Sequence, residues 1–302
     1  MKRLYGIVIP MITPLTEDDQ IDVESLKRLT DRCIEKGAHC LYPCGTTGEM
    51  MYLSVEERKL AAETVVQQAR GRVPVFIHVG AWNLKDTLCL AKHAVEAGAD
   101  GIGVVTPVFY SISDTGLTDY FSEVAKSVPS DFPVYLYGIK QNAVNDINYQ
   151  VCEKVAKQCP NVIGVKYSYP DMTRIQELTT IFQGAFDVLV GPDHLLTASS
   201  TIGVKGTVSG NAMCIPEHYQ RLWECLEKKD YQKALEIQRK TNILNSVMMD
   251  TGKNIAVYKA ILKKEGVIAS MRMRKPLEEL TEEEENAVLE KMDMLRYREC
   301  IY

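Results

Sequence analysis

The feature that most constrains this chain is an alternation of short apolar, β-rich runs with amphipathic helical runs, which continues to about residue 215. Such alternation is typical of repeated strand–helix–strand units and therefore of a parallel sheet. Strands are expected at Gly6 to Ile12, Cys40 to Pro43, Val73 to His78, Gly101 to Thr106, Pro133 to Tyr137, Val162 to Lys166, Asp187 to Gly191 and Lys205 to Ser209. Eight such units close more naturally into a (β/α)8 barrel, a TIM barrel, than into an open sheet.

Local signals place helices between these strands. Ser54 stands three residues before Glu57, and this pair predicts a capping box at a helix start. The positions that then recur at helical spacing, and are expected to face the core, are Leu60, Ala61, Thr64, Val65 and Ala69. The phrases EKGAHC, EAGAD and TIGVKG each put a glycine where a helix ends and a strand follows.

After Ser209 the pattern changes to helices alone. They are expected at Glu217 to Lys228, Tyr231 to Met249, Asn254 to Glu265 and Glu282 to Arg296. We therefore predict a catalytic barrel over residues 1–228 and a helical C-terminal extension, packed on the barrel, over residues 229–302. A chain of 302 residues accommodates this arrangement, since α/β barrels commonly occupy roughly 250 residues as one domain.

Nucleotide-binding alternatives lack their motifs. A dinucleotide-binding fold needs GxGxxG directly after a strand, but GIGVVT at Gly101 has no third glycine, and no GxxxxGK occurs. The net charge of −5, without a basic stripe, argues against a nucleic-acid partner.

Cellular location is predicted from the cysteines and the apolar runs. The nine cysteines form no CxxC pair and lie in apolar stretches, so they are expected to be reduced core residues in a cytoplasmic protein. No apolar run approaches the roughly 18 residues of a membrane-spanning helix. The apolar start of the chain is interrupted by Pro10 and Pro14, which favours a first strand over a targeting segment.

In such barrels the active site lies at the carboxyl ends of the strands. After the second expected strand comes Gly45-Thr46-Thr47-Gly48-Glu49, where glycines, hydroxyls and backbone amides could cradle a carboxylate. A plain turn with a helix cap explains the same residues. The loop Ser209-Gly210-Asn211-Ala212 after the last strand could also line a ligand, or be structural only.

Two further strand ends carry reactive groups. Lys166 ends an apolar run and should point to the barrel mouth, where a desolvated amine is a nucleophile suited to Schiff-base chemistry. A solvated lysine is the alternative. Tyr137 ends the preceding strand, and its phenol either relays a proton beside that amine or simply packs in the core.

This set of motifs resembles the dihydrodipicolinate synthase / N-acetylneuraminate lyase family of class I aldolases over essentially the whole chain. The motifs that carry the resemblance are GTTGE at Gly45 to Glu49, YLYG with Tyr137, GVK ending at Lys166, GPD at Gly191 to Asp193, GTVSGNA at Gly206 to Ala212 and MRKPL at Met273 to Leu277. The resemblance implies a Schiff base of pyruvate, or another 2-oxo acid, on Lys166 and proton transfer by Tyr137. It implies carboxylate binding by Thr46 and Thr47, and it requires neither a metal nor an organic cofactor.

Departures from the family pattern bear on the substrate. Synthases of the family normally have an arginine a few residues after the tyrosine, where this chain has Asn142, and a tyrosine where it has Phe109, followed by Tyr110. Losing the arginine removes a clamp for the carboxylate of an amino-acid aldehyde. We therefore expect cleavage of a 2-oxo sugar acid to pyruvate and an aldehyde. The hydroxyl-binding groups expected for this substrate are Asn142, Ser168, Asp193, His194, Ser209 and Asn211.

The sequence is also compatible with other functions. The first is 4-hydroxy-tetrahydrodipicolinate (dihydrodipicolinate) synthase activity, which condenses pyruvate with aspartate semialdehyde. The second is a non-catalytic binder of 2-oxo acids or sugar acids, which would need neither Lys166 nor Tyr137. A metal-dependent aldolase is disfavoured because the five histidines lack ligand spacing and only His78 and His194 lie near strand ends. The resemblance also implies a homotetramer, with Phe109 and Tyr110 at a subunit interface near the site.

Overall fold

The structure is a computed structural model, and it describes residues 1–299. Its strands are β1 (Gly6–Ile9), β2 (Cys40–Leu41), β3 (Phe76–His78), β4 (Gly101–Val105), β5 (Val134–Gly138), β6 (Val162–Tyr167), β7 (Asp187–Val190) and β8 (Gly206–Val208). They form one parallel sheet in the order β2-β1-β8-β7-β6-β5-β4-β3. A parallel bridge between Leu41 and Val75 joins the two ends of this order. The predicted (β/α)8 barrel is confirmed.

Several strands are shorter than expected. The first was expected to reach Ile12, but pairing stops at Ile9, directly before Pro10. The third was expected from Val73 and begins only at Phe76, after Pro74. Proline has no backbone N–H to donate to a ladder, so it limits strand pairing at both places.

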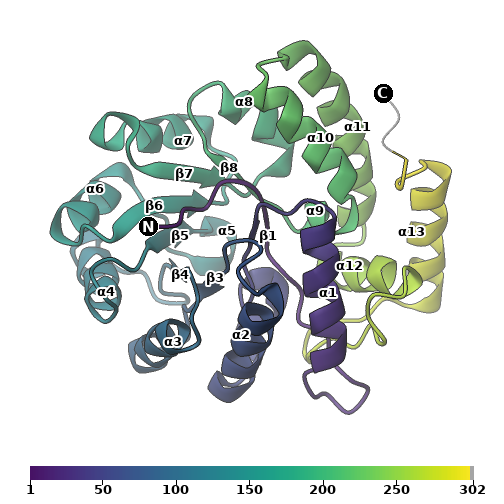
Figure 1. Cartoon of the computed structure of the whole chain (residues 1–302), viewed down its shortest axis with the longest axis horizontal. Coiled ribbons are helices and arrows are strands. Elements are labelled where there is room, and N and C mark those ends of the chain that lie inside the picture. The colour runs from purple at the N-terminus through teal and green to yellow at the C-terminus, as the bar shows by residue number, and fades with distance from the viewer. Residues whose placement is uncertain (300–302) are drawn as a thin grey trace.

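The helices are α1 (Val23–Glu35), α2 (Val55–Ala69), α3 (Leu84–Glu96), α4 (Asp114–Lys126), α5 (Lys140–Ala143), α6 (Tyr149–Gln158), α7 (Met172–Thr179), α8 (Leu196–Ser200), α9 (Asn211–Cys214), α10 (Pro216–Glu227), α11 (Tyr231–Met249), α12 (Asn254–Lys264) and α13 (Glu282–Met294). Short 3-10 helices are η1 (Thr46–Gly48), η2 (Met50–Tyr52), η3 (Ile181–Gly184) and η4 (Asp193–Leu195). Figure 1 shows the longer helices arranged around the strands, with α11, α12 and α13 together at one side.

The helix signals are mostly confirmed. Ser54 and Glu57 form the predicted capping box of α2. Gly37, Gly98 and Gly203 have φ values of +88°, +78° and +96°, the left-handed conformation that ends a helix. Leu60 is a correction, because it is 42% exposed. The buried positions Ala62, Val65 and Ala69 repeat at three and four residues, and at roughly 100° per residue Leu60 falls on the opposite side of the helix.

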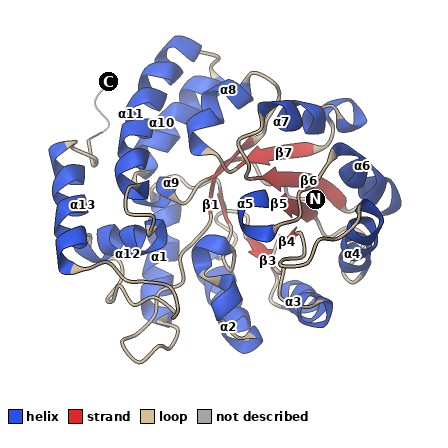
Figure 2. Ribbon diagram, turned by 180° about the vertical axis from the view of Figure 1, so that it is seen from behind, coloured by secondary structure: helices blue, strands red, loops and turns tan. Residues whose placement is uncertain are grey.

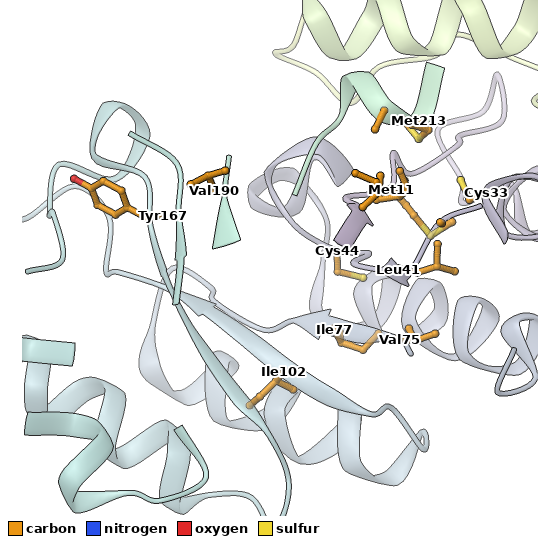
Figure 3. Packing of buried hydrophobic residues seen from close by; sticks show 14 of the residues in the cluster. Met11, Cys33, Leu41, Cys44, Val75, Ile77, Ile102, Tyr167, Val190 and Met213 are labelled. Carbon is orange, nitrogen blue, oxygen red and sulfur yellow. The ribbon is translucent and has the colours of Figure 1, made fainter. Parts of the chain in front are cut away.

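Successive residues along the strands point alternately into the barrel interior and into the layer between strands and helices. The barrel interior holds Leu4, Val8, Cys40, Tyr42, Phe76, Tyr135, Leu189 and Val208. The alternate residues belong to the larger cluster between strands and helices, of which Figure 3 shows Leu41 of β2, Ile77 of β3 and Val75 directly before β3. In β6, Val165 and Tyr167 belong to this outer cluster. Because side chains alternate, Lys166 between them points into the barrel.

The C-terminal helices are closely tied to the barrel. Helix α10 packs on β1, α11 contacts α8 and α10, and α12 contacts α9 as well as α11 and α13. In both views α12 lies between α13 and the barrel (Figures 1 and 2). The expected α11 bounds are found unchanged, while α10, α12 and α13 end one or two residues earlier than expected. The domain division after residue 228 stays a prediction.

Most cysteines are buried and free, as expected. Cys89 on α3 is a correction, because its side chain is exposed, and Cys300 lies outside the described residues. Burial raises the pKa of Cys33 to about 12 and that of Cys44 to about 11, which keeps these thiols protonated and unreactive. In the described part of the chain, no helix has the length and apolar character needed to cross a membrane.

Candidate active site

A cavity of about 1100 Å³ opens at the carboxyl ends of the strands. The strand ends and loops of the barrel form most of its wall, and the C-terminal helices complete it. Of the residues predicted from the sequence, those that line it are Thr46, Thr47, Phe109, Tyr137, Asn142, Lys166, Ser168, Asp193, His194 and Asn211. Ser209 and Tyr110 are not among the lining residues: Ser209 is buried and accepts a hydrogen bond from the Ala212 N–H, and Tyr110 is exposed.

Lys166 and Tyr137 lie side by side because they are register partners on neighbouring strands β6 and β5. The Nζ atom of Lys166 lies 3.8 Å from the centre of the Tyr137 ring and 5.3 Å from that of Tyr42. Lys166 is only 5% exposed, and within residues 1–299 no side chain forms an ion pair or hydrogen bond with its amine. The structure therefore presents a buried amine, without a counter-ion, at the cavity floor.

The phenol of Tyr137 is held from the other side by the turn after β2. Its hydroxyl shares a hydrogen bond of 3.2 Å with the hydroxyl of Thr46. Thr46 and Thr47 are half-buried in η1 and face the cavity. Thr13 braces this turn by donating its hydroxyl to the Gly48 carbonyl at 2.8 Å. Amine, phenol and the two threonine hydroxyls thus form one compact group.

A buried arginine supports this group from behind. Arg58 on α2 donates to the carbonyl oxygens of His78 and Gly80 at 2.7 and 2.8 Å, and its side chain forms no ion pair with a carboxylate among residues 1–299. Burial and the positive charges of Arg58 and Lys166 hold the pKa of His78 well below its usual range. His78 is therefore a neutral core residue here and not a general base at ordinary pH.

The opposite wall carries a carboxylate that is only partly satisfied. Oδ2 of Asp193 accepts a hydrogen bond of 2.6 Å from Asn211, whereas Oδ1 is buried with no hydrogen-bond partner among the described residues. Burial raises the pKa of Asp193, while nearby groups on Ser209, Asn211 and Tyr219 oppose part of that rise. Oδ1 is therefore the oxygen left to accept a further donor, but the atom is buried in this structure and does not face the open cavity.

The side chain of Ser168 fits beside Gly191 only because glycine has no side chain. A Cβ atom on Gly191 would lie 2.1 Å from the Ser168 hydroxyl oxygen, so only glycine at position 191 leaves room for that side chain. Both residues line the cavity, half-buried. The GPD motif therefore has a steric reason for its first residue, since it lets Ser168 face the cavity.

The cavity mouth is aromatic and exposed. Phe109 and Tyr110 are 69% and 73% exposed, and their rings meet edge to face with centres 5.0 Å apart. Trp82 lines the mouth and is also largely exposed. Asn142, at the position where synthases carry arginine, is exposed on α5. No arginine lines the cavity in the described part of the chain.

Sequence reasoning missed the contribution of the C-terminal helices. The lining residues from α11, α12 and the segment after them are Asn242, Asn245, Ser246, Met249, Asn254, Ile255, Tyr258 and Leu277. It also missed Tyr42, although the position of this tyrosine two residues after Cys40 gives it the same inward direction. No local spacing could have placed α11 and α12 at the cavity. Among the described residues, no group of three or more acidic, histidine or cysteine side chains could hold a metal ion.

Residues 3–294 match the family model described as the dihydrodipicolinate synthetase family. The chain is 36% identical, over 77% of each chain, to a 4-hydroxy-tetrahydrodipicolinate synthase from Thermus thermophilus. It is 30% identical to an N-acetylneuraminate lyase from Mediterraneibacter gnavus, over 98% of this chain and 93% of that one. Among solved structures it resembles YagE, a prophage protein of the same family from E. coli K12 in complex with pyruvate, with a TM-score of 0.92 at 28% identity, covering 97% and 99% of the two chains.

Proposed function

Because the chain belongs to the dihydrodipicolinate synthetase family, we propose that it is a class I aldolase that reversibly cleaves a 2-oxo sugar acid to pyruvate and an aldehyde. The observation that carries this proposal is the buried Lys166 amine against the Tyr137 ring, in a cavity with no arginine among its described lining residues. Members of the family are lyases. The proposed mechanism uses the Lys166 amine as its nucleophile and calls on no metal or organic cofactor.

In the proposed mechanism, the Lys166 amine attacks C2 of the 2-oxo acid, water leaves, and a protonated imine forms. The C3–C4 bond then breaks, its electron pair moves into the imine to give an enamine, and Tyr137 relays the proton released by the C4 hydroxyl. The aldehyde departs, C3 of the enamine is protonated, and hydrolysis of the imine releases pyruvate. Thr46 and Thr47 bind the carboxylate, and the Thr46–Tyr137 hydrogen bond keeps the phenol beside the reacting carbons.

The lining of the cavity supports a neutral hydroxylated substrate. Asn142, Ser168 and Asn211 offer hydrogen-bonding groups without net charge, and Asp193 lines the same cavity with one carboxylate oxygen that has no partner among the described residues. Aspartate semialdehyde brings a second carboxylate, which a buried site usually meets with a bidentate arginine. A missing clamp of this kind costs a few kcal/mol, or roughly two orders of magnitude in affinity.

The alternative is 4-hydroxy-tetrahydrodipicolinate synthase activity, favoured by the identity of 36% to the Thermus enzyme. Side-by-side coupled assays distinguish the two. We expect kcat/KM for cleavage of a sugar acid to exceed that for condensation with aspartate semialdehyde at least tenfold. Efficient condensation, without cleavage across a broad sugar-acid panel, would establish the alternative.

Covalent trapping tests the shared chemistry of both candidates. Borohydride with pyruvate should add one reduced pyruvyl unit, which peptide mapping assigns to Lys166, and Lys166→Ala should abolish labelling and turnover. A Lys166→Ala variant that turns over at the wild-type rate would instead refute the Schiff-base mechanism. Turnover by the wild-type protein would by itself exclude a purely non-catalytic binding role. Binding of sugar acids by the inactive Lys166→Ala variant would not change that conclusion.

We also propose that the chain assembles as a homotetramer in the cytoplasm. The exposed rings of Phe109 and Tyr110 support an interface at this position, since exposed aromatic pairs are costly unless a neighbouring subunit covers them. Sedimentation at micromolar concentration should show an oligomer. A strictly monomeric species would remove this part of the proposal.

A further inference from the structure

Two adjacent residues of α12 reach two different walls of the cavity. Lys259 extends toward the turn that carries Thr46 and Thr47, and Tyr258 extends toward Asp193. Helix α12 is not a barrel helix, and it lies between α13 and the barrel (Figures 1 and 2). Both contacts are buried.

Lys259 forms an ion pair with Glu49 in which both side chains have 0% exposure and the two atoms lie 2.5 Å apart. The pair is completed by backbone groups of one segment: Lys259 donates to the Arg272 carbonyl at 2.5 Å, and the Arg274 N–H donates to the other oxygen of Glu49 at 2.7 Å. Oε1 of Glu49 has Lys259 as its charge partner but forms no regular hydrogen bond with any described residue. The ion pair and the two backbone contacts together restrict both buried side chains.

Glu49 transmits that geometry to the carboxylate-binding turn. Its backbone N–H donates to the Thr46 carbonyl at 3.1 Å and so closes η1. Its φ of 61° lies in the left-handed region, which a residue with a side chain adopts only where its surroundings enforce it. Because the side chain of Glu49 is fixed by Lys259, the backbone that presents Thr46 and Thr47 is fixed too.

Tyr258 acts on the other wall through one intermediate. Its hydroxyl donates to Oδ1 of Asn211 at 2.8 Å, which orients the amide so that Nδ2 donates to Oδ2 of Asp193. The other oxygen of Asp193 is buried and has no hydrogen-bond partner among the described residues, so it can accept a further donor only after a local rearrangement. A Cβ on Gly210 would lie 2.8 Å from the Tyr258 ring, so the loop after β8 is shaped to admit this tyrosine.

We propose that Lys259 and Tyr258 are positioning residues for opposite ends of the substrate: Lys259, through Glu49, for the 2-oxo acid end, and Tyr258, through Asn211 and Asp193, for the hydroxylated end. The second half rests on the proposed function, because it assigns to Asp193 a hydroxyl of the aldehyde portion. Neither residue touches the reacting atoms. Their effects should be separable, because the two chains of contacts share no residue.

The first assay measures the 2-oxo acid end by borohydride trapping over a range of pyruvate concentrations. Lys259→Met alone leaves a buried carboxylate unpaired, so the deciding variant is Glu49→Gln/Lys259→Met, which removes both charges at similar volume. We expect the pyruvate concentration for half-maximal labelling to rise about tenfold in the double variant, the size of one or two misplaced hydrogen bonds. Tyr258→Phe and the control Lys264→Met, a lysine of the same helix paired with Asp293, should remain at the wild-type value.

The second assay measures the hydroxylated end in the condensing direction. Pyruvate is offered with glyceraldehyde or with propanal, which lacks hydroxyls, and the ratio of the two kcat/KM values reports hydroxyl recognition. We expect Tyr258→Phe to lower this ratio about fivefold, the order of one lost orienting hydrogen bond, because the loss falls mainly on the glyceraldehyde value. The control Tyr149→Phe removes a hydroxyl that donates to Glu153, away from the cavity, and should keep the wild-type ratio.

The outcomes are distinct. A double variant with wild-type pyruvate dependence overturns the role of Lys259, and so does an equal effect of all variants on both assays, which would indicate general loosening. A wild-type enzyme that is labelled by pyruvate but does not prefer glyceraldehyde overturns the role of Tyr258 and weakens the sugar-acid proposal, while the first assay still stands. A wild-type enzyme that no 2-oxo acid labels refutes the proposed function itself.

Discussion

The Glu49–Lys259 pair makes a quantitative stability prediction, because the chain contains a matched pair that differs mainly in burial. Lys264, on the same helix, pairs with Asp293 at the same separation of 2.5 Å, but those side chains are 31% and 53% exposed instead of 0%. Exposed pairs contribute about 0–1 kcal/mol to the free energy of unfolding. Removal of one partner from a buried pair lowers that free energy by roughly 3–5 kcal/mol. Lys259→Met should therefore destabilise the protein far more than Lys264→Met.

The cost has an identifiable origin. In Lys259→Met the carboxylate of Glu49 stays buried and keeps only the Arg274 N–H as a partner, while the Arg272 carbonyl loses its donor. At roughly 2–4 °C per kcal/mol for a domain of this size, we expect a fall in Tm of about 10 °C, against at most a few degrees for Lys264→Met. In Glu49→Gln/Lys259→Met no charge is left unpaired, so most of the lost stability should return.

Thermal and denaturant unfolding of the four proteins, each with midpoint and slope, measures these differences. Equal stability of Lys259→Met and Lys264→Met would show that burial of the pair has no energetic consequence. A double variant as unstable as Lys259→Met would show that the loss came from packing of the lysine chain and not from the unpaired carboxylate. Either result would contradict the electrostatic reasoning.

Three further predictions concern the cavity. Tyr137→Phe should lower kcat by roughly 10²-fold, the usual effect of a lost acid–base group, while borohydride still traps the imine on Lys166; an unchanged kcat would leave Tyr137 a packing residue. Gly191→Ala should displace Ser168, whose hydroxyl oxygen would be 2.1 Å from the new Cβ, and lower kcat/KM for hydroxylated substrates in steady-state assays; wild-type values would show that Ser168 is not needed. Asp193→Asn should weaken hydroxyl recognition yet raise Tm at neutral pH. Burial raises the pKa of Asp193 in the folded protein above its ordinary value of 3.8. The stability that the protonated Asp193 contributes is therefore complete below pH 3.8 and is lost as the pH rises through the pKa of the folded state. The gain in Tm should shrink toward pH 4, and a gain independent of pH would contradict it.

The barrel itself was predictable because it depends on local signals that agree with one another. The alternation of strands and helices, the Ser54 capping box and the helix-ending glycines are each encoded within a few residues. Strand ends were less predictable, because pairing also depends on what the neighbouring chain offers. Pro10 and Pro74 limited the first and third strands, a consequence that follows from the missing N–H and could have been drawn from the sequence.

The floor of the site was predictable in part. Lys166 and Tyr137 are the last residues but one of β6 and β5 and therefore lie near the mouth, but their contact depends on the register between the two strands, which shifts at Val134 and Tyr135. A shift of one residue changes which face of the sheet a side chain occupies, and no pattern within a single strand reveals it. The position of the amine over the phenol ring follows from this pairing.

Several residues at the rim of the cavity have backbone conformations that their residue types do not favour, which is why the rim could not be predicted from the sequence. Glu49, Phe109 and Val144 line the cavity with φ values of 61°, 76° and 62°, although none is glycine, and Cys44 beside the carboxylate-binding turn has 63°. Such conformations are unfavourable for residues with a side chain, most of all for a β-branched valine, and occur where surrounding contacts enforce them. For Glu49 those contacts come from α12 and the segment that follows it, about 200 residues away in the chain, so the enforcing groups lie in the C-terminal extension. The C-terminal extension therefore determines the shape of the cavity and forms part of its wall. The sequence around each rim residue does not predict this, because the contacts come from a distant part of the chain.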